Sequence, residues 1–327
     1  MKPIAITIGD PAGIGPEVAA KVVASTQPKT PWVLVGARWS LEAGAKAAGI
    51  TLPDIPSISD VEEASTEIAL YEIGLDQPDD FSYGSVQAPC GEIAVRSVEW
   101  AAKECLAENL SAMVTCPLNK EAIHAAGYVD DLGHQEILAR LSGASWTATM
   151  LMTPGLRVAH LSTHKSLIEA ARYVQRETVL EKLTLVHQTV AQWGIEQPRI
   201  AVAALNPHGG EGGILGREEI EELAPAVSQA QARGIAATGP IPADSVFTRA
   251  IEGEFDVVLA LYHDQGHIAI KVHNFHESTT ATLGIPFVRT SVDHGTAFDI
   301  AGQGIANPQG LIAAIQAAED IVAGNLK

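Results

Sequence analysis

The stretch IAITIGDPAGIGPE, residues 4–17, joins a short apolar run to a glycine turn and then to a proline. Ile4 to Ile8 has the length and composition of a buried strand. Gly13 and Gly15 follow it, and Pro16 suits the first turn of a helix, where its missing N–H needs no partner. A strand that leads directly into a helix is the repeating unit of a parallel sheet.

The same alternation continues along the chain. Segments such as 176–193, and the region from Leu311 to Val322, carry apolar residues at helical spacing. The pattern predicts an α/β fold with largely parallel sheets and helices on both faces. Residues 51–90, rich in Pro, Ser and Asp, are predicted to be an insertion or an irregular edge. The further buried strands predicted from apolar runs are Trp32 to Val35, Ala112 to Thr115, Val158 to Leu161, Ile200 to Ala204 and Val257 to Leu261.

Composition excludes several classes of protein. The 327 residues suffice for two domains, and 46% of them are hydrophobic, which is typical of a globular chain. A formal net charge of -18 without a long basic run argues against nucleic acid or an anionic membrane as the main partner. Three cysteines without a CxxC pair, no signal-like apolar segment and no 18-residue apolar stretch predict a cytoplasmic protein.

The glycine turn matches neither common nucleotide-binding motif. Val18 stands where GxGxxG requires its third glycine, and Pro16 follows Gly15 where a P-loop requires lysine. A helix N-terminus after this turn would suit an anion, but a purely structural turn explains the residues equally well.

Three predicted strands are each followed within four residues by a histidine: His164, His208 and His263. Because ligands gather at the carboxyl ends of strands in α/β sheets, a common rim would hold these side chains together. Three neutral imidazoles suit Zn²⁺, Co²⁺ or another divalent ion, although each histidine alone is better explained as a strand-end side chain bonded to backbone. Beyond His263, strand alternation predicts that Lys271 faces a cleft while Ile270 and Val272 stay buried.

The segment DHGTAFDIAGQGIANP, residues 293–308, closely resembles the adenosine-binding loop of the isopropylmalate and isocitrate dehydrogenase family. In that family the comparable loop wraps the adenine of NAD without a Rossmann fingerprint. The resemblance implies that His294, Gly295 and Asn307 contact the adenosine half of NAD or NADP. Asp299 either joins them or caps the following turn.

The chain as a whole resembles the 4-hydroxythreonine-4-phosphate dehydrogenase family of vitamin B6 synthesis. That family implies two αβα domains, a homodimer whose active site is shared between subunits, and a site in the interdomain cleft. We expect residues 1–125 plus 275–327 to form the first domain and 126–274 the second. The motifs that carry the resemblance are GDPAGIGPE at 9–17, GH at 133–134, THK at 163–165, LNPHGGEGG at 205–213, PAD at 242–244, YHDQG at 262–266 and GIPFVRTSVDHGTA at 284–297.

The resemblance also implies the ligands of the site. One divalent metal (Zn, Co or Mg) would be held by His164, His208 and His263. Among the family's substrate contacts His134, Lys271 and Arg289 match, and the two cations would bind a phosphate. Two positions depart: Gln135 replaces the usual Thr and Thr280 the usual Asn.

The implied reaction is an NAD(P)- and metal-dependent oxidation, with decarboxylation, of a 4-phosphorylated 3-hydroxy acid. The expected substrate is 4-phosphooxy-L-threonine in pyridoxal phosphate biosynthesis. Asp244, Asp264 and Lys271 are candidates for proton transfer, or, for the two carboxylates, for orienting a metal-bound imidazole. The general base stays open among them.

Gln135 and Thr280 keep alternative functions open. The first is oxidation of D-threonate or D-erythronate 4-phosphate in sugar-acid catabolism. Remoter alternatives are a dihydrodiol dehydrogenase, a phosphate acyltransferase of related architecture, and a protein that binds the ligands without catalysis.

Overall fold

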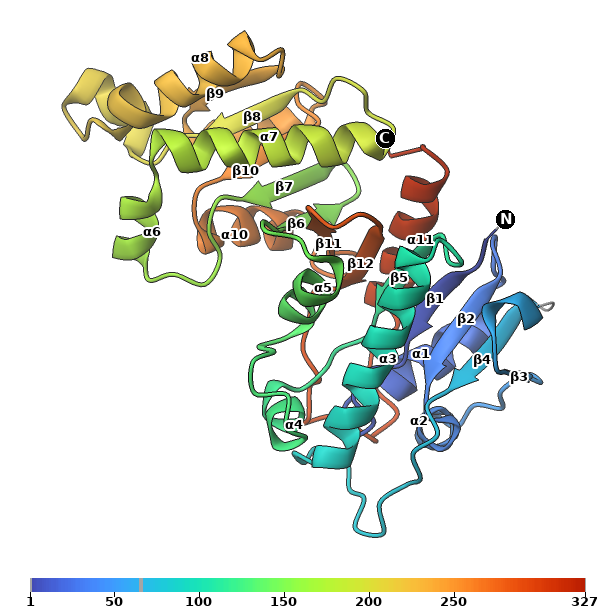
Figure 1. The fold of residues 1–327 in the computed structure, drawn as a ribbon. Helices are drawn as coiled ribbons and strands as arrows, with labels where there is room; N and C mark the ends of the chain where they lie inside the picture. The colour runs from blue at the N-terminus through green and yellow to red at the C-terminus, as the bar shows by residue number, and fades with distance from the viewer. Residues whose placement is uncertain (1, 65–66, 327) are drawn as a thin grey trace. The chain divides into compact units, whose positions relative to one another are not determined.

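The computed structural model describes residues 2–64 and 67–326, and the chain divides into two compact units. Unit 1 comprises Met1–Thr147 and Ile285–Val322, and unit 2 comprises Ala148–Gly284 and Ala323–Lys327. In both, strands alternate with helices along the chain (Figure 1). The predicted α/β class with largely parallel sheets is confirmed.

Unit 1 contains six parallel strands in the order β3-β4-β2-β1-β5-β12. The strands are β1 (Ile4–Thr7), β2 (Trp32–Gly36), β3 (Ser57–Ile58), β4 (Ile68–Glu72), β5 (Ala112–Thr115) and β12 (Val288–Val292). The helices are α1 (Gly15–Ser25), α2 (Arg38–Ala48), α3 (Ala88–Leu106), α4 (Lys120–Ala125), α5 (His134–Ser142) and α11 (Gln309–Val322), with a 3-10 turn η1 (Val61–Glu63). The stretch 51–90, predicted to be irregular, supplies the two strands at the sheet edge.

Both faces of the unit 1 sheet are buried because alternate side chains of each strand enter different cores. Ile4 and Ile6 of β1 pack with α1, α2 and α11, whereas Ala5 between them belongs to the core formed with α3, α4 and α5. Every residue of β1 is therefore buried, as its continuous apolar run predicts.

Unit 2 contains six strands in the order β11-β6-β7-β10-β8-β9. The pairs β11–β6 and β6–β7 are antiparallel, and β7, β10, β8 and β9 are parallel. The strands are β6 (Ala148–Thr153), β7 (Leu156–His160), β8 (Ile200–Ala203), β9 (Ala237–Ile241), β10 (Val257–Ala260) and β11 (Thr279–Leu283). The helices and turns are α6 (Leu167–Tyr173), α7 (Arg176–Gln192), η2 (Pro207–Gly213), η3 (Glu219–Leu223), α8 (Ala224–Ala232), α9 (Ala243–Ile251) and α10 (His263–His273).

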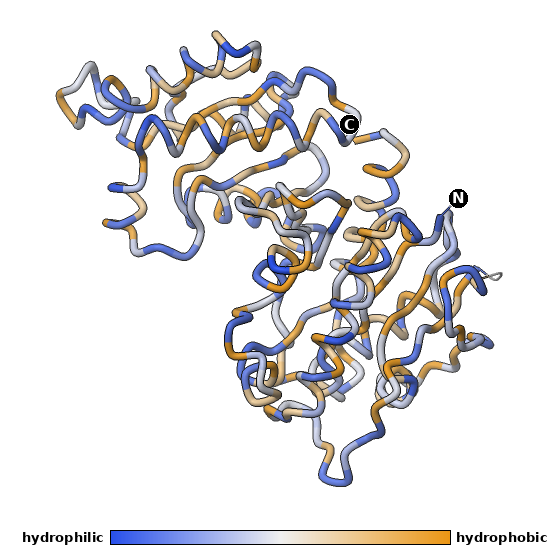
Figure 2. The backbone as a smooth tube through the Cα atoms, viewed as in Figure 1, coloured by the Kyte–Doolittle hydropathy of each residue, from blue (hydrophilic) through white to orange (hydrophobic). Residues whose placement is uncertain are grey.

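Helix α7 shows how the helices of unit 2 attach to its sheet. Its backbone alternates between hydrophobic and hydrophilic colour along the helix (Figure 2), and Val179, Leu183, Val186 and Val190 are buried. Helices α9 and α10 pack against strands β6 to β10 through a separate apolar cluster. Within the described part of the chain, no helix is long and apolar enough to cross a membrane.

The two units differ from the expected domain division at both of its junctions, and Ala323–Lys327 also belong to unit 2. Residues 126–147 belong to unit 1 because α5 packs on α3, and the two helices share one apolar core. Residues 279–283 belong to unit 2 because β11 is hydrogen-bonded to β6 along its whole length. Neither contact is visible in the local sequence, since both join segments far apart in the chain.

The segment after His263 is helical, so the predicted strand alternation around Lys271 was wrong. Residues 263–273 form α10, in which Ile270 is buried but Val272 is 82% exposed. The helix packs one side, through Ile270, on β6 and β7.

Candidate active site

The three histidines expected to bind metal all follow strands of one parallel group in unit 2. β10 lies between β7 and β8, so the carboxyl ends of the three strands meet at one edge. Hydrogen bonds join these ends: Gln265 accepts from the Leu261 N–H (2.7 Å) and donates to the Ala204 carbonyl (2.8 Å). Ser162 donates to the Leu261 carbonyl (3.1 Å). The backbone that leads to each histidine is therefore fixed at a common rim.

Two of these histidines have one ring nitrogen held by a carboxylate. His263 Nδ1 lies 2.7 Å from Asp264 Oδ1, and His208 Nδ1 lies 2.9 Å from Glu211 Oε1. A carboxylate on Nδ1 fixes the ring orientation and leaves Nε2 available, which is the arrangement typical of metal-ligating histidines. His164 is exposed on the loop after β7.

His208 lies in an unusual left-handed turn. His208 to Gly213 all have positive φ, from 47° to 98°, and His208 and Glu211 are not glycines. Non-glycine residues in this region are strained by about 1–2 kcal/mol each, and such strain is concentrated at functional sites. The glycines among them adopt this backbone without strain, which accounts for the run of glycines around His208.

Within residues 2–64 and 67–326, no three His, Cys, Asp or Glu side chains converge closely enough to form a metal site on their own. The structure instead gathers histidines around His263 that the sequence did not single out. His267 stacks on His263, and the buried His160 lies 4.7 Å from His267 between ring centroids. Burial lowers the pKa of His160 to about 3, so this ring is neutral.

In unit 1, a buried cation lies at the carboxyl end of β5. The Arg289 side chain on β12 is buried and donates to Thr115 Oγ1 (2.6 Å). Loss of water lowers the pKa of the Arg289 guanidinium to about 9, so the group stays charged at neutral pH. A desolvated guanidinium is a strong partner for an anion, because a planar fork can bind two oxygens.

His134, the first residue of α5, lies within electrostatic reach of Arg289. Burial, with a further contribution from Arg289, holds the pKa of His134 well below its usual range, so its imidazole is neutral. Its Nε2 is buried and has no hydrogen-bond partner in the described part of the chain. A buried polar atom of this kind normally has a partner, so Nε2 is suited to contact a bound ligand.

The remaining expected substrate residues are distributed over both units. Gln135 in unit 1 donates from Nε2 to Thr147 Oγ1 (2.8 Å), which leaves its carbonyl oxygen available. In unit 2, Thr280 lies in β11, and Lys271 Nζ is 5.4 Å from the centroid of the Phe275 ring. Asp244 is exposed in the first turn of α9.

The expected cofactor residues lie together on the loop between β12 and α11. Asn307 is exposed, and its Oδ1 accepts from the Gln309 N–H (3.0 Å) at the start of α11, so its amide nitrogen is available. His294 Nδ1 lies 3.0 Å from the Gly295 carbonyl oxygen. The Asp299 carboxylate is exposed, and its backbone carbonyl accepts from Gln303 (2.8 Å).

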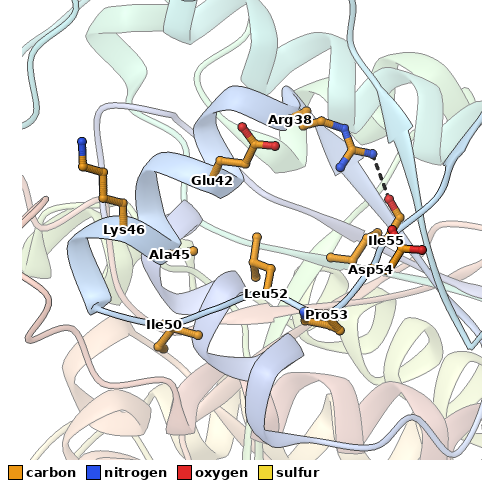
Figure 3. Close-up of a pocket in the computed structure, with 9 residues that line it drawn as sticks. All are labelled: Arg38, Glu42, Ala45, Lys46, Ile50, Leu52, Pro53, Asp54 and Ile55. Atoms are coloured by element: carbon orange, nitrogen blue, oxygen red, sulfur yellow. Dashed lines mark hydrogen bonds between the residues drawn. The ribbon is translucent and has the colours of Figure 1, made fainter.

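A pocket of about 460 Å³ lies elsewhere in unit 1, between α2 and the segment after it. It presents Arg38, Lys46 and Glu42 above an apolar floor (Figure 3). Arg38 already donates to the Ile55 carbonyl (3.0 Å) and to Ser57. None of the residues expected from the sequence lines this pocket, and its mixed charges point to no particular ligand.

Several residues of the candidate site were missed in the sequence. His267 follows His263 by one helical turn, so its position would have been apparent had α10 been recognised as a helix. Thr115 was recognisable as the polar last residue of a predicted strand. His160 lies inside an apolar run and carries no local signal.

Comparisons with known proteins agree with these observations. The family model described as pyridoxal phosphate biosynthetic protein PdxA matches residues 28–318. The D-threonate 4-phosphate dehydrogenase of Cupriavidus necator is 42% identical over 319 residues, covering 96% of this chain and 95% of the relative. The 4-hydroxythreonine-4-phosphate dehydrogenase of Beijerinckia indica is 42% identical over 314 residues, covering 94% and 92%. A crystal structure of 4-hydroxythreonine-4-phosphate dehydrogenase from Klebsiella pneumoniae is similar to this fold with a TM-score of 0.91 and 39% identity, covering 98% of this chain and 100% of that one.

Proposed function

Since this chain belongs to the PdxA family of pyridoxal phosphate biosynthetic proteins, and is thus a dehydrogenase, we propose that it oxidises a 4-phosphorylated 3-hydroxy acid. The observation that carries the substrate class is the buried pair in unit 1. Arg289 supplies a desolvated positive charge. The neutral His134 beside it is hydrogen-bonded to the Cys116 backbone through one ring nitrogen, so its partnerless Nε2 is an acceptor for a hydroxyl group of the substrate. In a chain of formal charge -18, a phosphate needs such a local cation.

The first candidate substrate is 4-phosphooxy-L-threonine, as in the relatives named for it. The second is D-threonate or D-erythronate 4-phosphate. Its support is the equal similarity to the Cupriavidus necator enzyme and the departures at Gln135 and Thr280 from the family's usual Thr and Asn. The two candidates differ at C2, where the first carries an ammonium and the second a hydroxyl.

The histidine rim of unit 2 fits a divalent ion such as Zn²⁺, Co²⁺ or Mg²⁺. His208 and His263 each have Nδ1 held by a carboxylate and Nε2 available, and His164 follows the neighbouring strand. When bound, the ion would lower the pKa of the substrate hydroxyl. Asp264 keeps His263 in one tautomer and orientation, which is a positioning role. Asp244, exposed at the first turn of α9, and Lys271 are the remaining candidates for proton transfer.

The loop between β12 and α11 is the proposed binding site for NAD or NADP. Asn307 has an exposed amide nitrogen, and His294, Gly295 and Asp299 are exposed on the same loop. The cofactor, when bound, would accept the hydride from the substrate carbon. The protein's part is to hold the adenosine half by contacts from these residues.

We further propose a cytoplasmic homodimer whose metal ligands come from both subunits. A shared site is what the resemblance to the 4-hydroxythreonine-4-phosphate dehydrogenase family implies. Several large apolar side chains of unit 2 are exposed, among them Leu167 (66%), Ile214 (84%) and Val272 (82%). A subunit interface that covers such side chains would remove their apolar surface from water.

The direct test is reduction of NAD and NADP by the purified protein with each candidate substrate. We expect turnover with a 4-phosphorylated hydroxy acid in the presence of a divalent ion and little turnover with the dephosphorylated acid or a dihydrodiol. The separate alanine variants of His164, His208 and His263 should lose metal content and activity but keep the circular dichroism spectrum of the folded protein. The exposed His124 in unit 1, changed to alanine, is the control and should retain both.

A further inference from the structure

The loop 293–308 forms no helix or strand, so much of its shape depends on partners elsewhere in unit 1. The backbone N–H groups of two loop residues are hydrogen-bonded to one side chain of α1. Glu17 Oε2 accepts from the Gly304 N–H (3.1 Å), and Glu17 Oε1 accepts from the Ala306 N–H (2.7 Å). One buried carboxylate thus satisfies two backbone donors of the loop.

Lys21, one helical turn after Glu17, binds the backbone carbonyl groups of the same two loop residues. Its Nζ donates to the Gly304 carbonyl (3.0 Å), to the Ala306 carbonyl (2.7 Å) and to Glu17 Oε1 (2.8 Å). The two side chains therefore satisfy four backbone groups, as a neighbouring strand would. We call Glu17 and Lys21 the α1 clamp.

The α1 clamp is largely shielded from water. Glu17 is 2% exposed and the Lys21 side chain 17% exposed. Hydrogen bonds to charged groups are stronger than those between neutral groups, and the low polarity around them strengthens them further. Loss of either partner leaves a buried charge without its counter-charge, so the clamp holds the loop only while both are present.

The glycine turn before α1 contacts the beginning of the same loop. The Ile14 N–H donates to the Thr296 carbonyl (3.0 Å), and a Cβ on Gly13 would lie 2.9 Å from the Thr296 side chain. The motif GDPAGIGPE, which matches no nucleotide-binding pattern, thus contacts residues 296, 304 and 306. Gly13 and Glu17 of this motif both contact the loop and help to determine its shape.

From these contacts we infer that Glu17 and Lys21 are positioning residues for the nicotinamide cofactor. By fixing Gly304 and Ala306, they determine where the next residue, Asn307, presents its amide. Neither clamp residue needs to contact the cofactor. The inference rests on the proposed cofactor role of 293–308, and the test must separate failure of that role from failure of the clamp.

The test compares Glu17→Gln and Lys21→Met with the wild type. Both variants preserve much of the side-chain volume and remove one charge of the clamp. The matched controls are Glu92→Gln and Arg96→Met, because this pair has the same i,i+4 spacing on α3 and a 3.5 Å ion pair but is 43% exposed at both residues. Lys21→Arg retains the charge and serves as the conservative variant.

Two measurements are made on each protein. Fluorescence titration with NADH and NADPH gives the Kd, and hydrogen–deuterium exchange resolved by peptide gives the protection of residues 293–308. We expect both clamp variants to raise the cofactor Kd at least tenfold and to speed exchange in the loop, with the KM of the phosphorylated substrate changed less than twofold. Lys21→Arg should recover most of the affinity, and the controls should match the wild type.

Each result decides one of the two claims. Loop exchange at the wild-type rate in both clamp variants overturns the clamp, and faster exchange with an unchanged Kd overturns its role in cofactor positioning. A wild type that binds neither NADH nor NADPH overturns the cofactor assignment instead, while the exchange data still decide whether the clamp holds the loop. Should Glu17→Gln not fold, as thermal unfolding would reveal, Lys21→Met alone carries the comparison.

Discussion

The imidazole rings of His263 and His267 stack nearly parallel, with centroids 3.6 Å apart and planes 10° apart. His267 Nδ1 also lies 3.0 Å from the His263 carbonyl oxygen. Behind this pair lies the buried His160, and Gly266 leaves room for it, because a Cβ at that position would lie 2.2 Å from His160 Nε2. His263 is thus held by Asp264 at its edge and by His267 across its face.

The stack predicts that His267→Ala weakens metal binding although His267 is not one of the proposed ligands. Loss of a group that orients a ligand typically costs tenfold to a hundredfold in metal affinity, and we expect about tenfold here. Calorimetric titration of the metal-free protein with Co²⁺ or Zn²⁺ measures it, with His124→Ala as the control. An affinity equal to that of the wild type would show that Asp264 alone orients His263.

The amide of Asn307 predicts a specific effect on the cofactor. Asn307→Ala removes both the proposed cofactor donor and the acceptor for the Gln309 N–H, whereas Asn307→Asp keeps that acceptor and exchanges the donor for a negatively charged oxygen. We expect both variants to raise the NADH or NADPH Kd about five- to tenfold, as for a neutral hydrogen bond, without changing metal content. An unaltered Kd in both would contradict the assignment.

Asp10, in the glycine turn after β1, predicts an unusual dependence of stability on pH. Its side chain is fully buried, and its Oδ1 accepts from the Ala12 N–H (2.8 Å). The backbone of Asn119 also stabilises the charged carboxylate, but the effect of burial is larger. Burial raises the pKa of Asp10 to about 6, above the value of about 3.9 for an unfolded chain. Because the folded state then holds the proton more tightly, the free energy of unfolding falls as pH rises from about 4 to 6 and levels off above it.

Asp10→Asn removes this penalty and retains the acceptor for Ala12. Relative to the wild type, the variant should gain about 2 kcal/mol more stability at pH 8 than at pH 4.5, from the pKa difference at 1.36 kcal/mol per unit. Urea unfolding at both pH values measures it. The control is Asp60→Asn, since Asp60 makes the same contact to the backbone two residues on but is exposed. A stability difference that is the same at both pH values would show that Asp10 is ionised throughout.

The strands of this fold were predictable because parallel strands buried on both faces are short, continuous apolar runs. Val257–Ala260 and Ile4–Thr7 show this. The helix α10 was not predicted, because the apolar run Ile268 to Ile270 and the alternation from Ile270 to His273 are equally compatible with a buried strand. Only the packing of Ile270 on the sheet decides between the two. The domain junctions depend on pairings between distant segments and have no local signal either.

Some residues of the candidate site were likewise predictable from the sequence, and others were not. Residues that follow strands, such as His208 and His263, were predictable because the topology of an α/β sheet brings strand ends together. The α1 clamp was not, since Glu17 and its loop partners are separated by 287 and 289 residues. Glu17 is the last residue of a glycine motif that is recognisable in the local sequence. Its structural role, however, depends on which distant loop packs against it.

The central claim is that the chain oxidises a phosphorylated hydroxy acid whose phosphate binds at Arg289. A charge-assisted contact contributes roughly 1.5–3 kcal/mol, so Arg289→Ala should lower kcat/KM by about tenfold to a hundredfold. Arg289→Lys should recover only part of this, because the planar fork that also donates to Thr115 is lost. The exposed Arg96, changed to alanine, controls for a general loss of positive charge.

The decisive measurement is the ratio of kcat/KM for a 4-phosphorylated hydroxy acid to that for its dephosphorylated analogue, in the wild type and in Arg289→Ala. Both proteins are compared at matched metal content and after thermal unfolding has shown that each is folded. The account predicts a strong preference for the phosphorylated acid in the wild type and loss of most of that preference in the variant. An equal preference in the two proteins would contradict it and place the phosphate elsewhere.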